Sequence, residues 1–108
     1  MDLRVHPRIP VQGLLGDISD GKSICTGVID NISLSGMSIS KLPKAVESKN
    51  KLLSVMVDGG NRYFKLVLKQ RWEIENGDNR TIGTEIQDSP WVWNEFVLQC
   101  QMRQVIAE

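Results

Sequence analysis

Short runs in which apolar and polar side chains alternate occupy most of this chain. Alternation with a period of two places successive side chains on opposite faces, as in a strand with one buried face. Turn-forming pairs such as Asp-Gly and Asn-Gly separate the runs. We predict six strands, over Val11–Leu15, Ser23–Ile29, Met37–Leu42, Leu52–Val57, Tyr63–Ile74 and Thr81–Ile86.

The longest run, residues 63–74, is also the most regular. Charged residues occupy one phase of it, and the other phase contains Phe64, Leu66, Leu68, Trp72 and Ile74. We therefore expect these five side chains to face the core. For Trp72 a second interpretation stays open, in which its ring stacks on a base bound at a nearby site.

The end of the chain has a helical period instead. Asp88, Ser89 and Pro90 are typical of a helix start, with a polar N-cap followed by proline at the first helical position. Apolar residues then recur at helical spacing on two faces, so we predict a helix that packs on the sheet and has a second apolar surface. The first face contains Trp93, Phe96, Val97 and Cys100, and the second contains Leu98, Met102 and Val105.

Six short strands followed by one helix predict a mainly all-β fold, a six-stranded antiparallel β-barrel with a C-terminal α-helix. Closing the sheet into a barrel removes its exposed edges. The 108 residues fit a single domain, which we place at residues 11–108. Residues 1–10 are expected to form a flexible arm, because Pro7 and Pro10 favour extended geometry in the residues before them.

Composition excludes several classes of function. The chain has 13 basic and 13 acidic residues, so bulk charge does not favour binding to DNA, RNA or anionic lipid. No apolar stretch is long enough to span a membrane, and no signal peptide is visible, so we expect a cytoplasmic protein. Cys25 and Cys100 lie among apolar residues, and reduced thiols are the favoured interpretation. There is no nucleophile–base–acid set and no metal-ligand cluster, so we expect no enzyme, no catalytic residue, no metal and no cofactor.

Two short motifs carry the candidate chemistry. The first contains Arg4 and Arg8, whose planar guanidinium groups suit phosphate oxygens and the O6/N7 edge of guanine. In a regular strand, residues four apart point to the same side, so the two arginines would present together. By itself this spacing favours the simpler interpretation, two solvated arginines at the N-terminus.

The second motif contains Asn31, Ser33 and Gly36, between two predicted strands. An Asn amide has both a donor and an acceptor for a purine edge, and a glycine lets a ligand approach the backbone. By itself the motif is also compatible with a side-chain-stabilised turn in which Gly36 supplies a positive φ.

Together, Arg4-x-x-x-Arg8, a strand, and Asn31-x-Ser33-x-x-Gly36 after the next strand resemble the signature of PilZ domains, R-x-x-x-R followed by D/N-x-S-x-x-G. The resemblance covers nearly the whole chain, including the six strands and the closing helix. It implies a bacterial receptor for the second messenger cyclic di-GMP, in which the arginine arm folds over a ligand lying on the barrel surface. A switch of this kind changes the surface shown to a partner.

The resemblance also implies a role for each matching residue. Arg4 and Arg8 would bind phosphate and guanine, Asn31 and Ser33 would read a guanine edge, and Gly36 would shape the turn for close approach. Ser35 and Trp72 are further candidates for ligand contact. Many family members have an extra arginine before the first motif, where this chain has Leu3, so one or two ligand molecules stay open. We expect an unidentified protein partner in trans, and a monomer or a homodimer.

Two other functions stay open. The same barrel could be a protein-interaction module that does not bind the nucleotide, with the apolar helix as its working surface. A barrel that binds single-stranded nucleic acid is disfavoured, because that function needs a basic groove with several exposed aromatic residues. Aromatic residues make up only 6% of this neutral chain.

Overall fold

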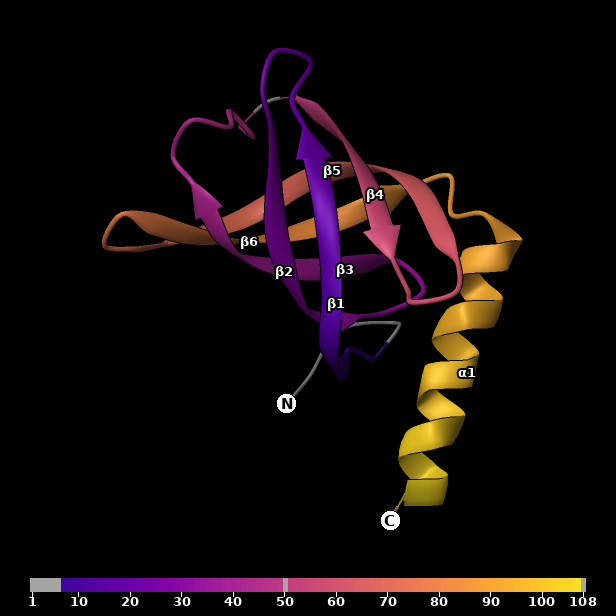
Figure 1. The fold of residues 1–108 in the computed structure, drawn as a ribbon. Helices are drawn as coiled ribbons and strands as arrows, with labels where there is room; N and C mark the ends of the chain where they lie inside the picture. Colours follow the sequence, from indigo (N-terminus) through magenta and orange to yellow (C-terminus); the bar gives the residue numbers. More distant parts are fainter. Residues whose placement is uncertain (1–6, 50, 108) are drawn as a thin grey trace.

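The structure of the protein is a computed structural model that describes residues 7–49 and 51–107, with side chains to residue 103. Six strands precede one helix, as Figure 1 shows. The strands are β1 (Ile9–Ser19), β2 (Ile24–Ile32), β3 (Gly36–Pro43), β4 (Leu52–Asp58), β5 (Tyr63–Asn76) and β6 (Asn79–Gln87), and the helix is α1 (Trp91–Ala107).

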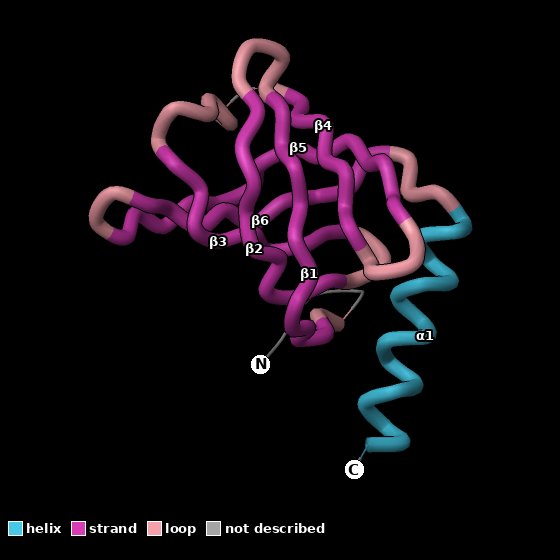
Figure 2. The backbone as a smooth tube through the Cα atoms, in the orientation of Figure 1, coloured by secondary structure: helices cyan, strands magenta, loops and turns pink. Residues whose placement is uncertain are grey.

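The six strands form a closed barrel in the order β1-β2-β3-β6-β5-β4, and every neighbouring pair is antiparallel. Figure 2 shows the strands wrapped around one interior, with α1 beside the barrel. The predicted fold is therefore confirmed. β1 begins at Ile9, inside the stretch predicted as an arm, and residues 1–6 of that arm lie outside the described residues.

The interior of the barrel is filled by branched aliphatic side chains from all six strands. Side chains that alternate along each strand point inward, as the period-two pattern requires. The central positions are completely buried, and they include Ile18, Ile29, Ile39, Leu53, Leu68 and Ile82.

A bulge in β5 overturns one part of the predicted core. Gln70 pairs with Thr84 and Trp72 pairs with Gly83, so Arg71 is an extra residue on the β5 side. One extra residue moves every later side chain to the opposite face. The prediction that Trp72 and Ile74 face the core is therefore wrong: they are 38% and 55% exposed.

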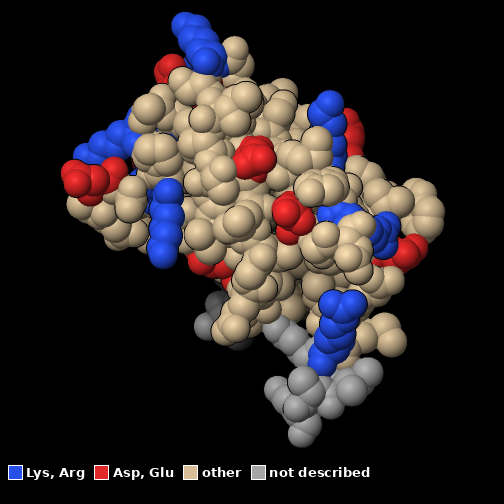
Figure 3. All heavy atoms as spheres, viewed as in Figure 1, with Lys and Arg blue, Asp and Glu red and all other residues tan. Residues whose placement is uncertain are grey.

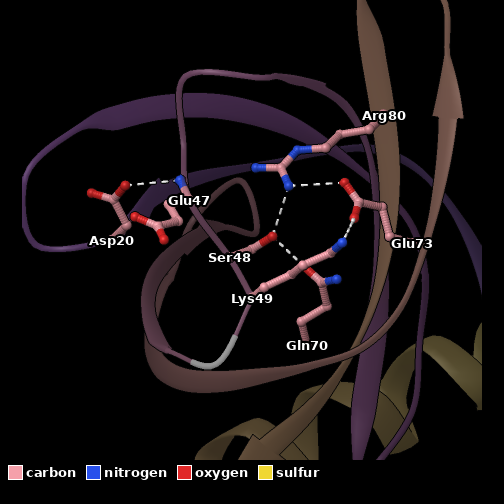
Figure 4. A network of polar contacts seen from close by, with 7 residues as sticks. All are labelled: Asp20, Glu47, Ser48, Lys49, Gln70, Glu73 and Arg80. Carbon is pink, nitrogen blue, oxygen red and sulfur yellow. Dashed lines mark hydrogen bonds and ion pairs between the residues drawn. The ribbon is translucent and has the colours of Figure 1, made fainter.

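The same bulge turns Glu73 of β5 into one end of the barrel, where it meets Arg80 (Figure 4). Arg80 is only 6% exposed, and its Nη1 donates to Ser48 Oγ at 2.8 Å and to Glu73 Oε1 at 3.0 Å. Ser48 also donates to the side chain of Gln70. Ser48 belongs to the connection between β3 and β4. Ser48 and Val46, two residues earlier, are both buried, so this loop closes the barrel end.

Asp20, in the β1–β2 connection, fastens this closing loop. Its Oδ1 accepts hydrogen bonds from the backbone N–H groups of Lys22 and Ser23 at 2.8 and 2.7 Å. Its Oδ2 accepts one from the N–H of Glu47 at 2.9 Å. These backbone donors hold the pKa of Asp20 well below its ordinary value. The carboxylate therefore remains ionised in the folded protein to low pH.

The helix buries the predicted face. Trp93, Phe96 and Val97 are buried against the barrel, and Leu98 and Met102 are exposed. The Pro90 carbonyl accepts from the N–H of Asn94 at 3.2 Å, so the helix begins one residue later than predicted. Within the described part of the chain, no helix has the length and apolar character needed to cross a membrane.

The two cysteines, Cys25 and Cys100, are free and half-buried. Burial raises the pKa of both thiols, which favours the protonated form at neutral pH. Since the thiolate is the reactive species, both side chains should react slowly with thiol reagents.

We predict that Glu73→Gln lowers the free energy of unfolding by about 3 kcal/mol at pH 7, because it leaves the buried Arg80 charge without its counterion. The hydrogen bond from Arg80 holds the pKa of Glu73 below its ordinary value. The Glu73–Arg80 ion pair therefore contributes its full stabilisation of the folded protein above the ordinary pKa of a glutamate. This stabilisation is lost as the pH falls through the lowered pKa of Glu73. Urea unfolding between pH 7 and pH 3 measures both effects.

Glu95→Gln is the matched control, because it breaks an exposed ion pair, that of Glu95 in α1 with Arg62 at 3.6 Å. Exposed pairs contribute little, so this variant should stay near the stability of the unmodified protein. Equal stability for Glu73→Gln and Glu95→Gln would show that Arg80 does not depend on its ion pair.

Candidate ligand-binding site

Arg8, which lies directly before β1, connects the first sequence motif with the second, because its side chain contacts Asn31. β1 pairs with β2 through Ile9 opposite Ile32 and Pro10 opposite Asn31, so the start of β1 lies at the end of β2. Arg8 Nη1 donates to Asn31 Oδ1 at 3.1 Å, and Nη2 donates to the Thr84 carbonyl oxygen at 3.4 Å. Two motif residues that are 23 positions apart in sequence are thus in direct contact.

The segment between Asn31 and Gly36, which we call the reading turn (residues 31–36), is held by Ser33. Ser33 Oγ accepts from the N–H groups of Ser35 and Gly36 at 3.2 and 3.0 Å. The Ser33 N–H donates to the Gly36 carbonyl at 2.8 Å. Because Ser33 is 1% exposed, its geometry favours support of the turn over direct contact with a ligand. Ser35 is exposed beside it.

Gly36 is required by close packing and not by its backbone angle. Among the described glycines, those with positive φ are Gly13, Gly21, Gly60 and Gly77. A Cβ on Gly36 would overlap the Thr84 carbonyl oxygen and lie 3.0 Å from Arg8 Nη2. The interpretation in which Gly36 supplies a positive φ is therefore wrong, and the glycine makes room for the guanidinium group.

Trp72 lies in the same row of the sheet as Asn31. Asn31 in β2 pairs with Ser38 in β3, Ser38 pairs with Gly83 in β6, and Gly83 pairs with Trp72 in β5. Three strand spacings separate the ends of this row, about 14 Å. A Cβ on Gly83 would overlap the Trp72 ring, so the indole lies directly over this glycine on the outer surface.

Charged side chains flank this row. Arg71 Nε and Glu85 Oε2 are 3.7 Å apart, and Lys69 pairs in register with Glu85. Lys69 and Arg71 are both exposed. We call Lys69 and Arg71 the basic rim of this row; Arg71 is paired with Glu85. On the face shown in Figure 3, in contrast, Lys and Arg are spread out among acidic side chains and form no single patch.

Three contacts made behind the site hold the reading turn and the strand beside it. Trp93 Nε1, from α1, donates to the Ser33 carbonyl at 3.1 Å. The N–H of Ile86 donates to the Ser35 carbonyl at 2.8 Å, and Thr84 Oγ1 donates to the Met37 carbonyl at 2.9 Å. Sequence reasoning missed Thr84, and for Trp93 it predicted helix–barrel packing or a partner surface and no hydrogen bond to the turn.

The site as described contains one guanidinium group, one carboxamide, an exposed indole and a basic rim. Arg4, the other predicted arginine, lies outside the described residues, and so does His6 between the two. Within residues 7–49 and 51–107, no group of three His, Cys, Asp or Glu side chains is placed to hold a metal ion. This arrangement can bind anionic and hydrogen-bonding ligands, and it offers a flat ring for stacking.

Comparison with known proteins gives a likeness of fold. No protein-family model and no curated protein matches the sequence. The solved structure of the Bacillus subtilis inhibitor of motility, MotI/DgrA, matches with a TM-score of 0.80 over 97% of this chain. The two sequences are 14% identical, and this chain spans 53% of that protein's length. The likeness therefore concerns the fold alone.

We predict that Gly36→Ala destabilises the protein by about 1–3 kcal/mol, the usual range for adding a methyl group to a closely packed position. The added carbon would force β3 away from the Thr84 carbonyl and displace Arg8. Thermal unfolding measures the loss, and Ser35→Ala, at an exposed neighbour, is the control that should change little. Equal unfolding midpoints for the two variants would contradict the close approach of β3, β6 and Arg8.

Proposed function

We propose that this chain, which has the fold of a PilZ-type protein, is a regulatory domain that binds cyclic di-GMP and passes the signal to a protein partner. The observation that carries the proposal is the contact between Arg8 and Asn31, residues from the two motifs whose combination resembles the PilZ signature. Folding brings them together at one place on the barrel surface, beside an exposed tryptophan and a basic rim.

The chemistry of cyclic di-GMP suits this surface. The ligand has two phosphates and two guanines, and a guanidinium group pairs with either a phosphate or the O6/N7 edge of guanine. Arg8 is already fixed at the site by Asn31 and the Thr84 carbonyl. Binding would exchange one or both of these contacts for contacts with the ligand. Arg4, four residues earlier, would supply the second guanidinium group.

The row from Asn31 to Trp72 offers a second region for the ligand. The Trp72 ring is exposed above Gly83, so one of its faces can stack on a base. Lys69 and Arg71, next to this ring in β5, are exposed and able to approach a phosphate. We place one base against Trp72 and a phosphate between that base and Arg8.

We expect calorimetric titration with cyclic di-GMP to show saturable binding. Arg8→Ala and Arg4→Ala should each weaken it by about tenfold to a hundredfold, the value of one or two charge-assisted hydrogen bonds. Arg103→Ala, which removes an exposed arginine of α1, is the matched control and should bind like the unmodified protein. The stoichiometry of the titration decides between one and two ligand molecules.

Absence of heat and of a thermal shift with the unmodified protein would contradict the proposal. The alternative would then be a protein-interaction module that does not bind the nucleotide. One observation favours that alternative: the described part of α1 exposes four large apolar side chains, Trp91, Val92, Leu98 and Met102. In that case the arginine variants would bind the protein partner as well as the unmodified chain does.

A separate prediction concerns stacking. Trp72→Ala should weaken cyclic di-GMP binding by about tenfold, because stacking a base on an aromatic ring contributes roughly 1–3 kcal/mol. The change is expected to leave the core intact, since the ring lies on the outer surface. Tyr63→Ala is the control, an exposed aromatic residue near the start of the same strand. Equal losses in the two variants would show that Trp72 does not contact the ligand.

A further inference from the structure

We infer that Trp93 is a positioning residue for the ligand site, because its indole N–H holds the reading turn from behind. The inference rests on the proposed function and extends it. It connects α1 to the turn whose first residue, Asn31, contacts Arg8 at the proposed site. The occupancy of the site and the attachment of α1 would then influence each other.

The hydrogen bond itself is well placed for this role. Trp93 is 0% exposed, and its Nε1 lies 3.1 Å from the Ser33 carbonyl oxygen. The indole ring packs against two phenylalanines, Phe64 of β5 and Phe96 of α1 itself. The ring of Phe64 meets it edge-on with centroids 5.4 Å apart, and Phe96 lies tilted against it at 5.7 Å. The donor is therefore held in one orientation and directed at the turn.

The contacts of Ser33 explain how the Trp93 indole N–H helps to position the turn. Its N–H and its hydroxyl are both used within the reading turn, so they fix the shape of the turn but not its position on the barrel. Its carbonyl is bonded to Trp93. Together with the bond from the Ile86 N–H to the Ser35 carbonyl, this contact attaches the turn to the rest of the molecule. Asn31 and Gly36, which contact or approach Arg8, are the two ends of that turn.

The position of α1 gives this connection a consequence for signalling. The buried residues Trp93, Phe96 and Val97 all lie in the N-terminal half of the helix. The C-terminal half extends beyond the barrel, as Figure 1 shows. If ligand binding moves the reading turn, the hydrogen bond to Trp93 would displace the N-terminal end of α1, which also contains the exposed Trp91.

The first test compares Trp93→Phe with Trp91→Phe in calorimetric titrations with cyclic di-GMP. Both variants remove one indole N–H from the same helix. In Trp93 this group is buried and bonded to the turn, whereas Trp91 is 71% exposed. We expect Trp93→Phe to bind about fivefold more weakly, the effect of one buried hydrogen bond, and Trp91→Phe to bind like the unmodified protein. Thermal unfolding of each variant confirms that it is folded.

The second test needs no substitution at Trp93. In a proton–nitrogen spectrum of the unmodified protein, addition of cyclic di-GMP should shift the indole N–H resonance of Trp93 and leave that of Trp91 in place. This readout follows the hydrogen bond itself, which general stabilisation of the fold would not move. It also decides the inference if Trp93→Phe does not fold.

The outcomes separate the two proposals. If the unmodified protein does not bind cyclic di-GMP, the proposed function fails. If it binds, but Trp93→Phe binds equally well or the Trp93 indole resonance does not move, the inference is overturned and the proposed function stands. Weakened binding by Trp93→Phe alone, together with a shifted Trp93 resonance, supports the inference.

Discussion

The extra residue in β5 is the constraint on which both the closed end of the barrel and the aromatic part of the proposed ligand surface depend. Because Arg71 has no partner in β6, the side chains after it exchange faces. Glu73 then points inward and neutralises Arg80, which would otherwise be a buried charge without a counterion. Trp72 points outward and becomes available for stacking. One irregularity in the ladder thus closes one end of the barrel and supplies the aromatic part of the proposed ligand surface.

Two glycines make the outer surface fit the groups that lie on it. Gly83 leaves room for the Trp72 ring, and Gly36 leaves room for the guanidinium of Arg8 and the Thr84 carbonyl. In both places a single methyl group would overlap a neighbouring residue. Close approach of backbone and side chain is therefore part of the site, and these positions are less tolerant of substitution than their place on the barrel surface suggests.

The sequence predicted the parts of the fold that depend on periodicity and the parts of the site that depend on side-chain chemistry. The six strands, the helix and its buried face followed from apolar spacing. The resemblance of the two motifs led us to expect Arg8 near Asn31. The outward position of Trp72 was beyond prediction, because periodicity assumes an unbroken ladder and residues 63–74 alternate well without a bulge. The Thr84 carbonyl was also beyond prediction, since every residue has a backbone oxygen and only the register of β3 and β6 selects this one.

The contacts of Arg8 suggest why such a site can act as a switch. A fully solvated arginine would lose considerable side-chain entropy on binding a ligand. Arg8 has lost part of that freedom already, because Asn31 and Thr84 hold it at the site. Its bond to Thr84 is long, at 3.4 Å, and therefore weak, so under the proposed function it would be exchanged for a charge-assisted bond to a phosphate or for a guanine edge. If the ligand also takes Nη1 of Arg8, Asn31 Oδ1 would be released at one end of the reading turn, whose middle is bonded to Trp93 of α1. Under the proposed function, a change in the contacts of the Arg8 guanidinium group would therefore affect the position of α1, because the reading turn is bonded to both.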